Sequence, residues 1–255
     1  MTAAVAAANI VLGIAYTSYG IITAIDMKRG WRTMGFSHFG AAWIFMAFTC
    51  GPHHLEHGLH LALAGRVGGP LDLAAVAIGL PFGVIWLLLR LEALSGGRGD
   101  RFISGTPWYL AIGPMVAAVY VTALGAAALT LLRTSEVGFA RTAVPNLLLL
   151  GLYAAIGAVL FKTQFENRPI EGGWSVSGLS LGVVFPTCGL MHTVHATYMS
   201  TGLYEYEWHG FTIDWLAVPA AAYFLWVVWA LYRGTLSDWN RAADRAPQPI
   251  VAGRA

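Results

Sequence analysis

The chain has 255 residues, of which 57% are apolar and only 11% are charged, and its formal net charge is +2. Soluble domains carry about 25% charged residues, so this composition excludes a globular protein with a fully polar surface. No basic run suggests a nucleic-acid partner, and the charges lie in short clusters between apolar stretches of about 20 residues, enough to cross a bilayer. The sequence therefore predicts an all-α integral membrane protein in contact with lipid, because only helices of this length satisfy their own backbone groups there.

Seven membrane-spanning helices are predicted in chain order, separated by Gly, Pro and polar residues. They cover roughly residues 4–25, 38–63, 71–91, 108–132, 143–162, 175–200 and 213–232. The apolar N-terminal stretch lacks the basic residues of a cleaved signal peptide, so it is interpreted as the first span. We expect a single transmembrane domain, 1–255, that ends in a tail at 233–255.

The distribution of basic residues predicts the orientation of these spans. The connections after the first, third and fifth spans, together with the tail, hold 12 of the 15 Lys and Arg residues. The other side holds only Arg66, Arg133 and Arg141. Because basic connections stay in the cytoplasm, we expect the N-terminus outside and the C-terminus inside.

An internal repeat appears when the chain is aligned with itself so that Cys50 falls on Cys188. We call this alignment the cysteine register. It pairs Gly13 with Gly151, Thr49-Cys50-Gly51 with Thr187-Cys188-Gly189, His54 with His192, His57 with His195, and Pro81 with Pro219. Spans one to three, about 4–91, then correspond to spans five to seven, about 143–232, and the span at about 108–132 connects them. An offset of four spans predicts parallel copies related by an axis along the membrane normal.

The repeated motif places one cysteine and two histidines on one face of a helix, at positions 0, +4 and +7. Polar groups at this depth are costly, which favours a functional role. The structural alternative is hydrogen bonding between helices by the histidines, with the cysteines as small apolar fillers. Two thiols and two to four imidazoles together suit a soft or borderline metal.

Several metal centres fit this donor set. A Rieske-type [2Fe–2S] cluster takes two cysteines on one iron and two histidines on the other, which a two-fold axis through both irons would supply. The +4 position lies about 6 Å along the helix from the cysteine and the +7 position about 10.5 Å, so Cys50, His54, Cys188 and His192 are the predicted ligands. His57 and His195 become supporting groups or part of a neighbouring site, and His53 ranks below them because Met191 stands at its repeat position.

Two other interpretations remain open. Haem b with His54/His192 and His57/His195 as axial pairs would make the chain a quinone-reactive cytochrome, although it leaves both cysteines unexplained. A divalent-metal transporter or sensor without a redox role would use the same donors for a metal such as zinc.

The motifs Thr49-Cys50-Gly51-Pro52-His53-His54-Leu55-Glu56-His57 and Thr187-Cys188-Gly189-Leu190-Met191-His192-Thr193-Val194-His195 resemble those of one family. Together with the size and the spans, they are similar to the membrane anchor of type F succinate dehydrogenases (respiratory complex II), which holds a Rieske-type cluster within the bilayer. The soluble Rieske pattern Cys-x-His-Leu-Gly is absent. The resemblance implies a bacterial plasma membrane, a flavoprotein subunit and an iron–sulfur subunit docked on the cytoplasmic side, and quinone as electron acceptor. Substrate oxidation then belongs to the other subunits.

Residues beyond the motifs, on the outer side, are candidates for a quinone site. A quinone headgroup needs hydrogen-bond donors and, on reduction, a supply of protons. The candidate donors are His60, Tyr198, Tyr204, Tyr206, Trp208 and His209, and the candidate proton relays are Glu56, Glu205 and Glu207. The alternative is an interfacial aromatic belt with solvated acids.

Overall fold

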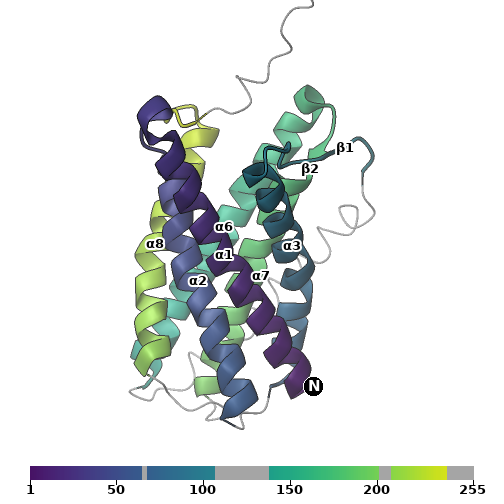
Figure 1. Ribbon diagram of the computed structural model, residues 1–255. Coiled ribbons are helices and arrows are strands. Elements are labelled where there is room, and N and C mark those ends of the chain that lie inside the picture. The colour runs from purple at the N-terminus through teal and green to yellow at the C-terminus, as the bar shows by residue number, and fades with distance from the viewer. Residues whose placement is uncertain (65–67, 107–137, 201–207, 240–255) are drawn as a thin grey trace, which may run out of the picture.

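The computed structural model describes residues 1–64, 68–106, 138–200 and 208–239, most of which are helical (Figure 1). The helices are α1 (Thr2–Met34), α2 (His38–Leu63), α3 (Pro70–Leu94), α6 (Gly138–Glu171), α7 (Val176–Ser200) and α8 (Trp208–Tyr232). Two strands of two residues, β1 (Phe102–Ile103) and β2 (Trp174–Ser175), pair antiparallel just before α7. The predicted all-α class is confirmed, and this short strand pair is an addition that the sequence pattern did not indicate.

Local sequence explains where helices begin. The Ser37 hydroxyl accepts a hydrogen bond from the backbone N–H of Gly40 at 2.9 Å, which caps the first turn of α2. α3 begins with Pro70, whose missing N–H is no loss in a first turn. The Asp72 carboxylate accepts from the backbone N–H of Gly69 at 2.9 Å and so closes the same turn. Both helix starts therefore satisfy their own backbone donors.

The six helices form a closed ring in which each helix packs mainly against two neighbours. The order around the ring is α1, α2, α8, α6, α7, α3 and back to α1. α1, α3, α6 and α8 run in one direction, and α2 and α7 run in the other (Figure 1). Exchanging α1, α2 and α3 with α6, α7 and α8 leaves both the ring order and the directions unchanged.

Five helices are long and apolar enough to cross a membrane. They are Thr2–Met34, Pro70–Leu94, Ala143–Glu171, Val176–Tyr198 and Thr212–Tyr232. α2 is not among them, because its histidines and Glu56 lower its mean hydropathy. Its 26 residues nevertheless extend about 39 Å, and it is held in the ring between α1 and α8. The predicted span at 108–132 lies outside the described residues.

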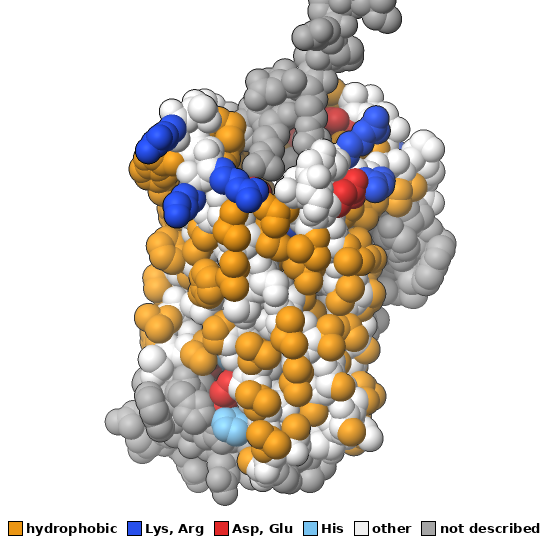
Figure 2. Space-filling model, viewed as in Figure 1, with side chains coloured by type: hydrophobic (Ala, Val, Ile, Leu, Met, Phe, Trp, Pro, Cys, Tyr) orange, Lys and Arg blue, Asp and Glu red, His pale blue; other side chains and the backbone are white. Residues whose placement is uncertain are grey.

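One end of the ring is basic. Every Lys or Arg side chain that the structure describes lies in the last third of α1, α3 or α6 or in the segment after α3 or α8. Those helices end on the same side, and Figure 2 shows the Lys and Arg side chains gathered there, above a broad belt of hydrophobic side chains. We call this side the basic end.

The ring interior differs along its length. The part of the interior nearer the basic end contains an aromatic cluster, in which the rings of Tyr19 and Trp86 stack with 3.7 Å between their centroids. Toward the other end lie buried polar side chains, namely Asn9, His53, His54, His57, Asp72, Asn146, His192, Thr193, His195 and Asp214. Buried polar groups destabilise a fold unless they are paired, so this polar region depends on contacts within itself.

Candidate metal centre

Two free thiols lie where the aromatic cluster meets the polar region. Cys50 on α2 and Cys188 on α7 line the same small cavity. Gly51, next to Cys50, allows α1 to approach closely, since a Cβ atom there would lie 2.9 Å from the backbone nitrogen of Thr17. At the equivalent Gly189, a Cβ atom would lie 3.3 Å from the side chain of Tyr153. The glycine of each motif therefore brings the neighbouring helix to the thiol.

Each thiol contacts a tyrosine from the other half of the ring. The hydroxyl of Tyr153 on α6 lies 3.1 Å from Cys50 Sγ, and that of Tyr16 on α1 lies 3.7 Å from Cys188 Sγ. A tyrosine hydroxyl donates readily to a thiolate, whereas a protonated thiol is only a weak donor. Both sulfur atoms therefore lie beside a hydroxyl that can donate a hydrogen bond to a thiolate.

His54 is held in one tautomer by an asparagine. Its Nδ1 lies 2.8 Å from Asn9 Oδ1, and Asn9 donates its amide N–H to the carbonyl oxygen of Val5 at 2.9 Å. Because the amide nitrogen is committed to Val5, the amide oxygen faces the imidazole, and Nδ1 must carry the proton. Nε2 is then the nitrogen with the lone pair, and it lies 4.0 Å from Cys188 Sγ.

His192 is held in the same way. Its Nδ1 lies 2.7 Å from Asn146 Oδ1, while the amide N–H of Asn146 donates to Asp214 Oδ2 at 2.8 Å. This network assigns the proton to Nδ1 and the lone pair to Nε2. The imidazole of His192 also packs against the Tyr153 ring, with 5.6 Å between ring centroids, as that of His54 packs against Tyr16 at 5.3 Å.

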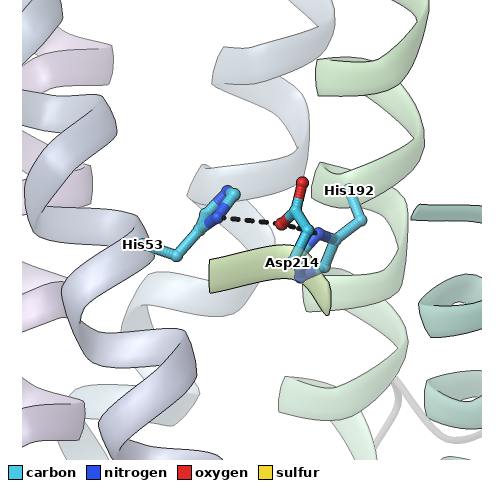
Figure 3. Close-up of side chains that lie close together, drawn as sticks. All are labelled: His53, His192 and Asp214. Atoms are coloured by element: carbon cyan, nitrogen blue, oxygen red, sulfur yellow. Dashed lines mark ion pairs between the residues drawn. The ribbon is translucent and has the colours of Figure 1, made fainter. Parts of the chain in front are cut away.

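The buried carboxylate of Asp214 on α8 lies between one histidine of each half. Asp214 Oδ1 lies 3.2 Å from His53 Nδ1 and 3.3 Å from His192 Nδ1, and all three side chains are at most 5% exposed. Figure 3 shows the two imidazoles directed at this carboxylate from α2 and α7. One ligand atom from each residue lies within 4.8 Å of the others, so this group could hold a metal ion. The sequence analysis assigned no role to Asp214 and ranked His53 last.

The two histidines at +7 extend the polar region away from the cysteines. His57 and His195 are buried, with 5.3 Å between their ring centroids, and the His53 ring lies 5.4 Å from that of His195. His57 Nε2 lies 3.9 Å from Asp72 Oδ1. The structure therefore brings these two histidines together one turn beyond His54 and His192, next to the first turn of α3.

The candidates for a quinone site are divided. Glu56 pairs with His60, with 2.7 Å between Oε1 and Nδ1 and both side chains partly exposed. Tyr198 is buried against Leu190 and Val194. Outside the described part of the chain lie Tyr204, Glu205, Tyr206, Glu207 and the side chains of Trp208 and His209.

Several contacting residues escaped the sequence analysis because the repeat was aligned without a gap. In the cysteine register, Asn9 and Tyr16 have no identical partner, but an offset shorter by one position places them on Asn146 and Tyr153. The structural contacts follow this shorter offset in α1 and α6, and the cysteine register in α2 and α7. The pairing of Gly13 with Gly151 is accordingly displaced by one position. A search that allowed one gap between the first two helices would have found both pairs.

The donor set is chemically coherent. Two thiols, each beside a hydroxyl donor, and two imidazoles, each with its Nδ1 proton held by an amide, match what a thiolate–imidazole metal centre requires of its ligands and of the groups that orient them. A [2Fe–2S] centre with mixed ligation fits these residues, since both cysteines and both orienting asparagines are present. Haem b would use the imidazoles alone. Comparison with models of known protein families, with curated proteins and with solved structures finds no match for this chain.

Proposed function

We propose that the chain is a membrane-embedded electron-transfer subunit that delivers electrons to a quinone through a metal centre held by Cys50, Cys188, His54 and His192. The observation that carries this proposal is the matched set of contacts in the two halves. Each half supplies one thiol, one imidazole with its Nδ1 proton held by an asparagine, and one tyrosine that reaches the thiol of the other half. Buried histidines need hydrogen-bond partners in any role, so the feature that favours a metal centre is the pair of thiols beside these imidazoles, with 4.0 Å between Cys188 Sγ and His54 Nε2.

The proposal includes the internal repeat and the seven-span topology. The exchange of α1, α2 and α3 with α6, α7 and α8 preserves the ring order, which supports two parallel copies around an axis along the membrane normal. The gathering of basic side chains at one end supports a cytoplasmic basic end. A reporter fused after Ala255 should then be cytoplasmic and one fused before Thr2 external, and an external C-terminus would contradict the model.

The proposed centre is a [2Fe–2S] cluster with the two cysteines on one iron and the two histidines on the other. Two imidazole ligands raise the potential of such a centre to about −150 to +300 mV, a range suited to reducing a quinone. The chain itself orients the imidazoles through Asn9 and Asn146 and directs the tyrosine hydroxyls at the sulfur atoms. Within the ring Cys188, His54 and His192 are buried and Cys50 is partly buried.

The partners follow from the resemblance to type F succinate dehydrogenase anchors. A flavoprotein subunit and an iron–sulfur subunit would dock at the basic end and supply single electrons. The quinone would bind toward the other end, where His60 and Glu56 form a polar pair at the partly exposed surface of α2 and Tyr198 lies on α7. Co-purification of the two soluble subunits with this chain would support the assignment.

A second candidate function, a divalent-metal protein without a redox role, is favoured by one observation. His53, His192 and Asp214 form a buried group that could hold a metal without either thiol. Haem b is the remaining alternative, through the His54/His192 and His57/His195 pairs.

Spectroscopy of the purified full-length chain separates these functions. A mixed-ligand cluster gives weak, broad visible absorption and, after reduction, an EPR signal with a low average g value. Haem gives an intense Soret band, and a divalent-metal protein such as a zinc protein gives neither. The Cys50→Ser/Cys188→Ser variant is the control, since it should lose the cluster signal but would leave a haem spectrum in place. A Soret band, or colourless protein without iron, would overturn the proposal.

A further inference from the structure

The buried group His53, His192 and Asp214 differs from an ordinary hydrogen-bonded ion pair. The nitrogen–oxygen distances of 3.2 Å and 3.3 Å are longer than the 2.7–2.9 Å of a charge-assisted hydrogen bond. Neither ring nitrogen of His53 has a hydrogen-bond partner in the structure, and neither has Asp214 Oδ1, although these side chains are only 2% and 1% exposed. Buried polar atoms without a hydrogen-bond partner indicate that an ion or a water molecule binds between these residues.

The distance from the Asp214 carboxylate to each imidazole matches that between two ligands of a single ion. Nitrogen and oxygen ligands lie about 2.0–2.2 Å from a divalent ion such as zinc, so two of them in a tetrahedral arrangement are separated by about 3.4 Å. The two observed distances from Asp214 Oδ1 agree with that separation. Two imidazoles and one carboxylate are also a donor set typical of zinc and other divalent first-row metals.

His53 and Asp214 both lack an identical residue at the corresponding position of the internal repeat. In the cysteine register, His53 corresponds to Met191 and Asp214 to Val76. His53 and Asp214 meet where α2 packs against α8, whereas Met191 and Val76 are buried in the apolar core of the opposite half, where α7 packs against α3. A polar pair on one side and an apolar pair on the other indicate that the ring does not need His53 and Asp214 for packing.

We propose that His53, His192 and Asp214 form a divalent-cation site with only nitrogen and oxygen ligands, and that it shares His192 with the thiol–imidazole centre. A neutral imidazole has a single lone-pair nitrogen. When the cation binds Nδ1, the proton of His192 moves to Nε2, and this nitrogen no longer binds iron. When Nδ1 donates to Asn146, Nε2 is available to the thiol centre. The two sites therefore exclude each other, a regulation that rests on the proposed function, whereas the cation site itself does not.

Cobalt(II) titration of the purified full-length chain, prepared without iron, tests the cation site directly. We expect one bound ion whose visible spectrum has d–d bands but no sulfur-to-cobalt charge transfer. The matched variant His53→Met/Asp214→Val installs the apolar pair that the opposite interface already contains, and it should lose this binding. The Cys50→Ser/Cys188→Ser variant should keep it. Cobalt binding that survives in the first variant, or that shows thiolate charge transfer and disappears in the second, would overturn the site.

Zinc supplementation during expression tests the exclusion. The iron content of the wild-type chain should fall as zinc content rises, while His53→Met, which leaves the Asn146–Asp214 contact in place, should keep its iron in the same medium. Iron content that is indifferent to zinc in the wild type would overturn the competition for His192. A chain that never contains iron, even without zinc, would instead contradict the proposed function, and the cobalt result would still decide the cation site.

Discussion

The interface between α2 and α8 and the interface between α7 and α3 occupy equivalent places in the ring but differ in chemistry. The first contains His53 and Asp214, and the second contains Met191 and Val76 at the matching positions of the cysteine register. The thiol, the histidine at +4, the asparagine and the tyrosine are present in both halves. The comparison separates a duplicated frame of residues around the two thiols from a single added polar pair beside it.

The largest expected effect concerns the duplicated frame. Replacing His54 and His192 together by alanine should abolish the mixed-ligand EPR signal and quinone reduction, because each removes a ligand from its half. Oxidation of substrate by the soluble subunits with an artificial acceptor should continue.

The matched control is His57→Ala/His195→Ala, which changes the histidines one turn further from the cysteines. This variant should keep a cluster with a shifted potential, since groups beside the ligands tune a metal site more than they empty it. Loss of the cluster in this variant but not in the first would show that the +7 histidines are the ligands.

The polar pair of His53 and Asp214 can be removed by replacing one partner or both. Asp214→Val alone leaves the amide N–H of Asn146 buried without its acceptor and removes the carboxylate beside His53, so it should destabilise the fold by about 1–3 kcal/mol. His53→Met/Asp214→Val should recover a large part of that loss, because replacing both partners of a buried polar contact by apolar groups is nearly neutral. Thermal unfolding in detergent measures both. A double variant less stable than Asp214→Val would contradict the equivalence of the two interfaces.

The two asparagines allow a comparison within the frame itself. Asn9→Ala or Asn146→Ala should weaken iron binding by about 10–100-fold, the usual effect of removing a group that orients a ligand. The loss should be larger for Asn146, because this amide also donates to Asp214. Iron retention against a chelator gives the measurement, with Asn9→Asp as the variant that keeps the acceptor oxygen. Equal iron retention in wild type and both alanine variants would contradict the orienting role.

The smallest expected effect comes from the tyrosine hydroxyls. Tyr153→Phe should lower the reduction potential of the centre, because a hydrogen bond to sulfur favours the reduced, more negative state. Tyr16→Phe should lower it less, since its hydroxyl lies 3.7 Å from Cys188 Sγ, compared with 3.1 Å between Tyr153 and Cys50. Redox titration followed by EPR compares the two. A larger shift in reduction potential for Tyr16→Phe than for Tyr153→Phe would contradict the expectation that the shorter hydroxyl–sulfur distance has the larger effect.

Much of the fold was predictable because hydrophobic length and helical periodicity are local properties. The apolar stretches predicted the helices, and the boundaries of α2 at 38–63 agree with the structure because Ser37 supplies a strong N-cap. The strand pair at β1 and β2 was not predictable, since two residues carry no periodic signal and their pairing depends on distant neighbours. The predicted span at 108–132 lies outside the described residues.

The sequence by itself determined which residues could serve a metal, since a repeated Thr-Cys-Gly-x-x-His-x-x-His motif within apolar helices is visible in one dimension. Only the tertiary structure decided which other groups meet them. Asn9 lies beside His54 because glycines let α1 pack closely on α2, and Asp214 lies beside His53 because α8 is next to α2 in the ring. Contacts between residues far apart in the chain, such as His53 with Asp214, depend on the order in which helices pack, which local patterns do not contain.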